Sequence, residues 1–344
     1  MNSFRPVVIA HRGASGYVPE HTLAAYALAI EMGADFVEPD LVMTKDGVLV
    51  ARHENEISQT TDVAEHREFA ARKTRKIIDG LEIDGWFTED FTLAELKTLR
   101  AKERIPQLRP DNQRFDGMFE LPSFEEVLAL VHGANLRFKI EARSRGEQEP
   151  RRVGVYPETK HPTYFRDIGL PMEDALVRML ERKAVIGKVF IQSFEAESLQ
   201  SLRQLTNKPL VQLLDDSGAP YDYIARGDQR TYADLIKPEG LAEIAGYADV
   251  IGVNKNLIIP PPGGRVGTPT TLIADARAAG LIVHGWTFRA ENCFLPQELR
   301  RPGGDAAPGD LAGEITAFLA QGMDGFFTDQ PDIGARVRDA FVTA

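Results

Sequence analysis

Short apolar, β-rich runs alternate with helical patterns over most of the 344-residue chain, and this alternation constrains the fold more than any other feature. Strands separated by helices predict a parallel sheet, and eight such strands predict a closed (β/α)8 barrel. A doubly wound open sheet is the alternative, but no GxGxxG motif follows the first run. The predicted strands are residues 7–11, 35–40, 153–158, 189–193, 209–214, 249–253, 281–286 and 325–328.

Helical patterns occupy many of the segments between these runs. The predicted helices are residues 172–184, 195–206, 240–248, 269–279 and 310–321.

The stretch from about residue 55 to 152 breaks this rhythm. It is rich in charge, with helical pieces at 92–101 and 123–132 and a solvated loop predicted at 143–152. Long insertions near the catalytic face of a barrel are where such folds vary substrate preference. We therefore expect one barrel domain over residues 1–344 that carries an insertion subdomain at approximately 55–152.

Composition excludes several classes of protein. A net charge of −11 argues against a nucleic-acid partner, although a bound divalent cation would still allow a small anionic substrate. The single cysteine, Cys293, excludes a disulfide framework and a multi-cysteine zinc site. No apolar stretch has the length of a membrane span, and the oligomeric state has no sequence signature. Without a signal-peptide core the chain as written is expected to be cytoplasmic, or periplasmic if a signal has been removed.

Polar residues stand at the ends of the first two predicted strands, where barrel enzymes keep their active sites. His11 and Arg12 end the first run, and Glu38 and Asp40 end the second. Residues two apart on a strand point to the same face, and two carboxylates there repel unless a cation lies between them or one is protonated. Solvated edge residues are the alternative, but the position at the barrel mouth favours a metal site.

The third strand adds another carboxylate and a cation, Glu158 and Lys160. Three carboxylates with water suit Ca²⁺ or Mg²⁺ and do not suggest zinc. Glu141 also follows an apolar β-like run, so it is a rival for the third ligand position. Gln192 ends the fourth run, and Trp286 ends the seventh, where it could form the apolar wall for a glycerol or choline group.

A second histidine is expected at the same end of the barrel. The sequence TKDG predicts a hairpin that returns residues 48–54 beside the second strand and brings His53 toward His11. Two histidines, three carboxylates and two basic residues fit a metal-assisted attack on a phosphodiester. The ion and the basic residues would hold the charge while one histidine activates a nucleophile and the other protonates the leaving alkoxide.

Several blocks of sequence resemble one family from end to end. They are IAHRGASGYVPEHTLAAYALAIEMGADFVEPDLVMTKDGVLVARHE, VGVYPETKHP, IQSF, VQLL and GMDGFFTDQPD. On these blocks the chain resembles the glycerophosphodiester phosphodiesterases, specifically the bacterial periplasmic-type branch. The resemblance implies a (β/α)8 barrel with an insertion after the second strand unit. It also implies hydrolysis of glycerophosphodiesters, such as glycerophosphocholine and glycerophosphoethanolamine, to an alcohol and sn-glycerol 3-phosphate.

The resemblance also implies roles for individual residues. The resemblance also implies that the protein binds one divalent cation, Ca²⁺ or Mg²⁺, and a small-molecule substrate. Two departures from the family pattern are Glu54, where aspartate is common, and His21, where many members have asparagine. The implied roles are catalysis for His11 and His53, metal ligation for Glu38, Asp40 and Glu158, and phosphate contact for Arg12 and Lys160.

Two other functions compete with this prediction. A catalytically silent relative could bind a glycerophosphodiester or serve as a scaffold, but it would not need both histidines. A barrel glycosidase would use two carboxylates without a metal and would leave both histidines and Lys160 unexplained.

Overall fold

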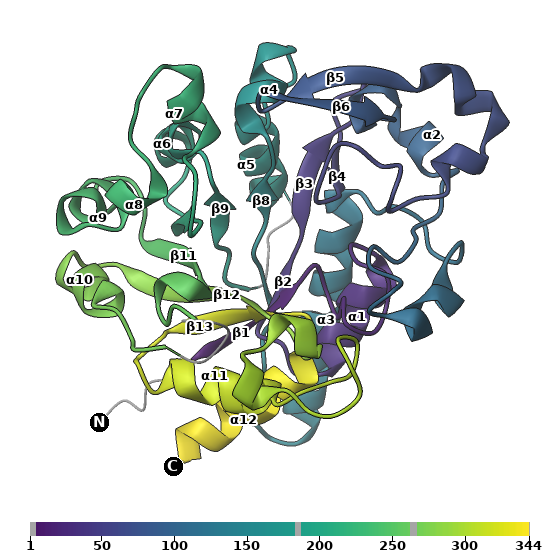
Figure 1. The fold of residues 1–344 in the computed structure, drawn as a ribbon. Helices are drawn as coiled ribbons and strands as arrows, with labels where there is room; N and C mark the ends of the chain where they lie inside the picture. The colour runs from purple at the N-terminus through teal and green to yellow at the C-terminus, as the bar shows by residue number, and fades with distance from the viewer. Residues whose placement is uncertain (1–4, 183–186, 262–266, 344) are drawn as a thin grey trace.

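The computed structural model describes residues 5–182, 187–261 and 267–343. Within these residues an eleven-stranded sheet has the order β4-β3-β8-β9-β10-β11-β12-β13-β1-β2-β7, and its neighbouring strands are parallel except for β3 and β4 (Figure 1). The strands are β1 (Val7–His11), β2 (Phe36–Glu38), β3 (Asp40–Met43), β4 (Leu49–Ala51), β7 (Gly154–Val155), β8 (Glu158–Thr159), β9 (Ile191–Ser193), β10 (Leu210–Leu214), β11 (Val250–Asn254), β12 (Ile282–Phe288) and β13 (Gly325–Thr328).

The sheet closes into a ring because two of its strands are each split into halves that appear at different places in this order. β2 and β3 are halves of one strand interrupted at Pro39, and β7 and β8 are halves of the next, interrupted at Tyr156 and Pro157. β2 pairs with β7, and β3 pairs with β8. With each interrupted strand counted once and the antiparallel β4 set aside, the described residues form the predicted eight-stranded parallel barrel, and the fold prediction is confirmed.

The hairpin expected after the second strand is present. β4 runs antiparallel to β3 on the outside of the ring, with Leu41 opposite Ala51. This pairing brings the chain back to the carboxyl-terminal end of β2, as the TKDG turn predicts.

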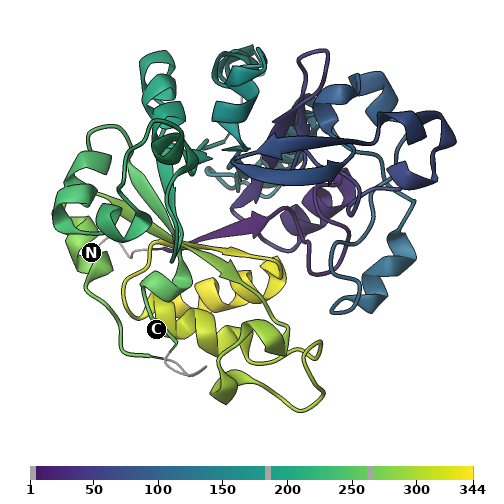
Figure 2. The ribbon, with the colours of Figure 1, turned by 45° about the horizontal axis from the view of Figure 1, so that its top comes forward.

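Helices surround the barrel, as Figure 2 shows. Each predicted helix is present with small shifts at its ends; residues 183–184 of the first lie outside the described residues. Among the described residues, no helix is long and apolar enough to cross a membrane. The helices are α1 (Leu23–Glu31), α3 (Phe124–Ser144), α4 (Pro162–Asp167), α5 (Glu173–Arg182), α6 (Ala196–Leu205), α7 (Tyr221–Ala225), α8 (Tyr232–Leu235), α9 (Pro238–Ile244), α10 (Leu272–Ala278), α11 (Leu311–Leu319) and α12 (Pro331–Thr343).

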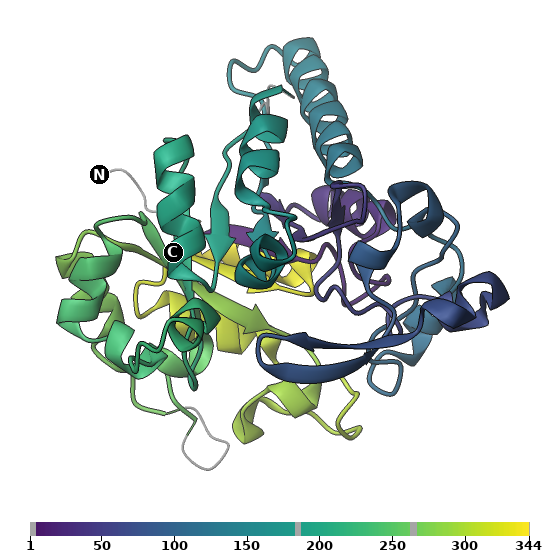
Figure 3. The ribbon, with the colours of Figure 1, turned by 90° about the horizontal axis from the view of Figure 1, so that it is seen from above.

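The segment between β4 and β7 differs in detail from its prediction. It contains the hairpin of β5 (Thr74–Ile78) and β6 (Leu81–Gly85), the short helix α2 (Leu93–Leu96), and then α3, which is much longer than the predicted piece at 123–132. Ser123 begins α3 with a capping box to Glu126. The amphipathic pattern then continues through Ser144, and Figure 3 shows α3 extending outward from the barrel.

The β5–β6 hairpin reaches from this segment toward α4, across one end of the barrel (Figure 1). Asp79 at its turn contacts the imidazole of His161 at a distance of 2.6 Å. His161 directly follows Lys160 in the chain, so the hairpin is fixed close to the predicted site.

The strand residues alternate between two apolar layers, because successive side chains point to opposite faces. In β1, Val8 and Ala10 belong to the core beneath the helices, whereas Ile9 belongs to a separate cluster inside the barrel. Complete burial of each such side chain contributes roughly 1.5–3 kcal/mol to folding. The interior cluster consists of Ile9, Phe36, Tyr156, Val211, Val250 and Phe327.

Candidate active site

Three of the predicted site residues lie two positions after an aromatic or aliphatic side chain of the barrel interior. His11 follows Ile9 in this way, Glu38 follows Phe36, and Glu158 follows Tyr156. The spacing of two keeps each polar side chain on the inward face and places it one step closer to the carboxyl-terminal mouth. The polar site therefore lies directly above the apolar layer that holds the barrel together.

Three carboxylates meet at this mouth, from β2, β3 and β8. One oxygen from each of Glu38, Asp40 and Glu158 lies within 4.8 Å of the others, and all three residues are buried. The backbone N–H of Arg12 donates to Oε2 of Glu38 at 2.7 Å, and the amide of Gln192 donates to Oε1 at 3.0 Å. This acidic cluster has the oxygen-rich donor set that hard divalent cations take.

The three carboxyls of this cluster differ in the direction in which their pKa values are shifted. Burial, followed by the negative charges of Asp40 and Glu158, raises the pKa of Glu38 well above its ordinary value. Burial also raises the pKa of Glu158 to about 8, with Asp40 adding to the effect. The pKa of Asp40 is instead lowered, because Lys160 and the histidines near it outweigh the effect of burial. Such mutual repulsion is what a divalent cation between the carboxylates would relieve.

Two basic side chains flank the carboxylates. The ammonium of Lys160 lies 2.7 Å from Oε1 of Glu158 and 3.5 Å from Oδ1 of Asp40. Nε of Arg12 lies 3.4 Å from Oδ2 of Asp40, and its Nη1 contacts Glu20 at 3.0 Å. Both basic residues line the same cavity as the carboxylates, so an anion there would meet two fixed positive charges.

His11 is held by a carboxylate from the last barrel strand. Its Nδ1 lies 2.6 Å from Oδ1 of Asp329, directly after β13. Burial and the charge of Arg12 lower the pKa of His11 to about 4, despite the opposing effect of Asp329. The ring is therefore neutral near pH 7, and its Nε2 is the nitrogen left for chemistry in the cavity.

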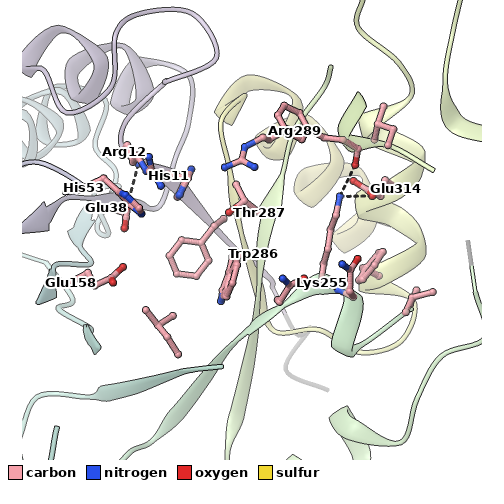
Figure 4. Close-up of a pocket in the computed structure, with 18 of the residues that line it drawn as sticks. His11, Arg12, Glu38, His53, Glu158, Lys255, Trp286, Thr287, Arg289 and Glu314 are labelled. Atoms are coloured by element: carbon pink, nitrogen blue, oxygen red, sulfur yellow. Dashed lines mark hydrogen bonds and ion pairs between the residues drawn. The ribbon is translucent and has the colours of Figure 1, made fainter. Parts of the chain in front are cut away.

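His53 has a similar partner from its own neighbour. Its Nδ1 hydrogen-bonds to the carboxylate of Glu54, and desolvation together with Arg12 and Lys160 lowers its pKa. Arg104 of the insertion in turn holds Glu54, with Nη2 2.6 Å from Oε2. The two histidines thus have the same arrangement, in which a carboxylate fixes Nδ1 and leaves Nε2 available. Figure 4 shows both rings beside Glu38 and Arg12.

Several of these supporting residues were missed by sequence reasoning. Asp329 stands at the end of the eighth predicted strand, in FTDQPD, so the strand-end argument applied to the other site residues could have found it. Arg104 and Arg109 lie in an irregular part of the insertion that carries no periodic signal. His21, noted only as a departure from the family pattern, is buried and donates to Oδ2 of Asp40 at 2.9 Å.

The structure separates the two rivals for the third carboxylate. Glu141 lies on α3, where its apolar neighbours belong to a helix and not to a strand, and it is absent from the acidic cluster. The strand-like interpretation of FKIEARS was wrong, because a run of that length cannot distinguish a helix from a strand. Gln192 and Trp286 both line the cavity; Trp286 donates to the carbonyl of Gly252 at 2.9 Å and packs against the edge of Phe194.

The site opens into one cavity of about 450 Å³. The acidic cluster and the two histidines lie at one side, and Lys255 and Glu314 lie at the other, with Trp286, Thr287 and Arg289 between them (Figure 4). A volume of this size is typical of a site for a small molecule.

Comparison with known proteins matches nearly the whole chain to one enzyme family. The model of the glycerophosphoryl diester phosphodiesterase family matches residues 11–333. A glycerophosphodiester phosphodiesterase of Arabidopsis thaliana, GDPD6, is 36% identical over 345 residues, which cover 96% of this chain and 85% of the relative. One from Bacillus subtilis is 34% identical, over 98% of this chain and 88% of the relative.

Solved structures support the fold. A phosphodiesterase from Oleispira antarctica, in complex with the product sn-glycerol 3-phosphate, aligns with a TM-score of 0.61 at 21% identity and covers 98% of each chain. A glycerophosphodiester phosphodiesterase from Agrobacterium tumefaciens aligns with a TM-score of 0.58 at 19% identity, over 96% of this chain and 99% of that one. The chain belongs to the glycerophosphoryl diester phosphodiesterase family, and the prediction of an enzyme of this class is confirmed.

Proposed function

We propose that this chain hydrolyses glycerophosphodiesters, such as glycerophosphocholine and glycerophosphoethanolamine, to an alcohol and sn-glycerol 3-phosphate with the help of one divalent cation. The observation that carries the proposal is the convergence of three buried carboxylates, two basic side chains and two histidines on one cavity. The structure of the Oleispira relative with sn-glycerol 3-phosphate supports the choice of product. A glycosidase would have no use for the histidines and Lys160.

Glu38, Asp40 and Glu158 would hold the cation, either Ca²⁺ or Mg²⁺. Their fit rests on the all-oxygen donor set and on the burial of all three carboxyls, which, with the neighbouring negative charges, raises the pKa of Glu38 and Glu158. When bound, such an ion neutralises phosphoryl oxygens and stabilises the charge that develops on them.

The basic residues of the chain bind and orient the phosphodiester. The guanidinium of Arg12 and the ammonium of Lys160 lie on either side of Asp40, so they meet the phosphoryl oxygens at the place where the acidic cluster opens to the cavity. Arg12 is anchored by Glu20, which limits the rotation of its side chain. These contacts hold the phosphorus between the two histidines.

The histidines move the protons. In net hydrolysis the oxygen of water adds to phosphorus, and the neutral imidazole of one histidine takes the proton at Nε2. The P–O bond to the leaving alcohol breaks, and the alkoxide takes a proton from Nε2 of the other histidine, which enters this step as an imidazolium with a proton on each ring nitrogen. Asp329 and Glu54 accept from the Nδ1–H of each ring, so Nε2 is the nitrogen that takes the proton in one histidine and gives it in the other.

Product analysis tests this proposal. The purified protein is incubated with glycerophosphocholine and a divalent cation, and the phosphorylated product is identified by ³¹P nuclear magnetic resonance. The expected product is sn-glycerol 3-phosphate with free choline, and His11→Ala and His53→Ala are each expected to lower kcat by about 10²–10⁴-fold. Phosphocholine with free glycerol, or full activity in both variants, would overturn the proposal.

A further inference from the structure

The far side of the cavity, opposite the acidic cluster, contains a buried ion pair that the proposed chemistry does not use. Lys255 directly follows β11, in the turn η5 (Lys255–Leu257), and Glu314 lies on α11. Nζ of Lys255 donates to Oε1 of Glu314 at 2.6 Å and to the carbonyl of Phe294 at 3.2 Å. Both residues line the cavity, and Figure 4 shows the pair across from His11 and Glu158.

This ion pair keeps unfilled hydrogen-bonding capacity. Glu314 is 1% exposed, yet its Oε2 accepts no hydrogen bond from any of the residues that the structure describes. An ammonium has three N–H donors, and the two contacts of Lys255 engage two of them. A buried polar atom without a partner is unfavourable by about 1–3 kcal/mol, so a ligand group that reaches Oε2 of Glu314 would supply the hydrogen bond that this atom lacks.

The ligand group that would complete the hydrogen bonds of this pair must both donate and accept. A hydroxyl group supplies one O–H donor and two acceptor lone pairs, which match a carboxylate oxygen and an ammonium N–H side by side. A trimethylammonium group has neither an O–H or N–H to donate nor a lone pair to accept, so it leaves both groups of the pair without the hydrogen bonds they lack; the nearby cations, Lys255 and Arg289, are each paired with a carboxylate. The guanidinium of Arg289 lies 4.8 Å from the ring centre of Phe294 and donates through Nε to Asp329 at 2.9 Å.

We propose that the Lys255–Glu314 pair binds a hydroxyl group of the leaving alcohol and thereby selects polyol leaving groups, such as glycerol or inositol, over choline. This inference rests on the proposed function, because it names the part of the substrate that the far side of the cavity receives. Trp286 and Thr287 lie between this pair and the acidic cluster, and all of them line the same cavity, so we place the leaving alcohol of a diester held at the cluster on the side of the pair. A site built to hydrogen-bond a substrate hydroxyl discriminates strongly against an analogue that lacks it.

Substrate preference of the native protein is the first test. Initial rates with a divalent cation give kcat/KM for glycerophosphoglycerol, glycerophosphoinositol and glycerophosphocholine. At least one polyol diester is expected to exceed glycerophosphocholine about tenfold or more. Equal values, or a preference for glycerophosphocholine, would overturn the inference while leaving the proposed function in place. Failure to turn over any of the three would overturn the proposed function and the inference with it.

A double variant then assigns the preference to this pair. Lys255→Met with Glu314→Leu removes both charges together, so that neither is left buried alone. The ratio of kcat/KM for the preferred polyol diester to that for glycerophosphocholine is expected to fall about tenfold or more. The matched control is Lys237→Met, which removes an exposed lysine paired with Asp234 outside the cavity and is expected to keep the ratio. An unchanged ratio in the folded double variant would overturn the inference; if that variant does not fold, the preference of the native protein decides.

Discussion

Arg109 of the insertion holds Asp329 of the barrel, with Nη2 2.5 Å from Oδ2, while Oδ1 of the same aspartate holds His11. Arg109 also contacts Oε1 of Glu291 at 2.5 Å and the carbonyl of Ser15 at 2.8 Å. The side chains of Arg109, Asp329 and His11 are all buried. Their contacts therefore link the insertion to a proposed catalytic histidine through the protein interior. Arg104 makes the equivalent link to His53 through Glu54.

Replacement of Arg109 by methionine is expected to lower kcat about tenfold or more and to change KM little. Asp329 keeps its contact with Arg289 in this variant, so the position of His11 is loosened and not lost. Arg109→Lys is expected to recover only part of the loss, because an ammonium cannot reproduce the divergent contacts of the guanidinium. Steady-state kinetics measure the effect. The matched control is Arg100→Met, since Arg100 donates through its Nη1 to backbone carbonyls within the insertion. A loss shared equally by both variants would contradict the account.

His21→Ala is expected to weaken cation binding about 10–100-fold, the effect usual for partners of metal ligands. His21 fixes the orientation of Asp40 through Nε2, and its Nδ1 lies 2.7 Å from the hydroxyl of Tyr26. Calorimetric titration of the chelator-treated protein with Ca²⁺ or Mg²⁺ measures the affinity. His66→Ala, which removes a histidine paired with Asp62 and Glu68 in the insertion, is the control expected to bind as the native protein does. Equal affinities in all three proteins would show that His21 does not support the site.

Stability is expected to fall in acid because His284 is buried inside the barrel. Burial lowers its pKa from 6.5 to about 3, and its Nδ1 lies 2.9 Å from the hydroxyl of Tyr156. Between these two pKa values the unfolded chain binds a proton that the folded chain does not, so the free energy of unfolding decreases as the pH falls from 6.5 toward 3. For this group alone the loss between pH 7 and pH 5 is about 2 kcal/mol.

Urea unfolding at the two pH values measures this loss. His284→Asn keeps a polar group near Tyr156 without a titratable ring, and its decrease between pH 7 and pH 5 is expected to be smaller than that of the native protein. His11 contributes in the same direction, since its pKa is also lowered, so some decrease remains in the variant. An identical decrease in both proteins would contradict the assignment to His284.

The sequence predicts the barrel and the inward-facing site residues for one physical reason. Strand periodicity is local, so an apolar residue such as Phe36 and a polar one two positions later, Glu38, share a face whatever the rest of the chain does. Closure of the ring then brings the strand ends together. For this reason the carboxylates of β2, β3 and β8 could be grouped before the structure was known.

The remaining parts depend on tertiary contacts with no local pattern. Arg104 and Arg109 reach the site from a segment without regular periodicity, and no spacing rule connects Arg109 to Asp329, which lies far along the chain. Glu141 fits a ligand position in the sequence because an apolar run of strand length also fits one side of a helix, and the capping box that begins α3 lies well before it. The pairing of Glu314 with Lys255 likewise could not be predicted from the sequence, because it depends on how α11 packs against the turn after β11.

Metal dependence of glycerol 3-phosphate release tests the central claim most directly. The protein is treated with EDTA, and initial rates are measured before and after addition of Ca²⁺ or Mg²⁺, for the native protein, Glu158→Gln and the matched control Glu141→Gln. The account predicts that EDTA abolishes activity and that a cation restores it in the native protein and in Glu141→Gln. It also predicts that Glu158→Gln needs a cation concentration about tenfold higher or more. Full activity in EDTA, or equal cation requirements for the two variants, would contradict the assignment of the acidic cluster as the metal site.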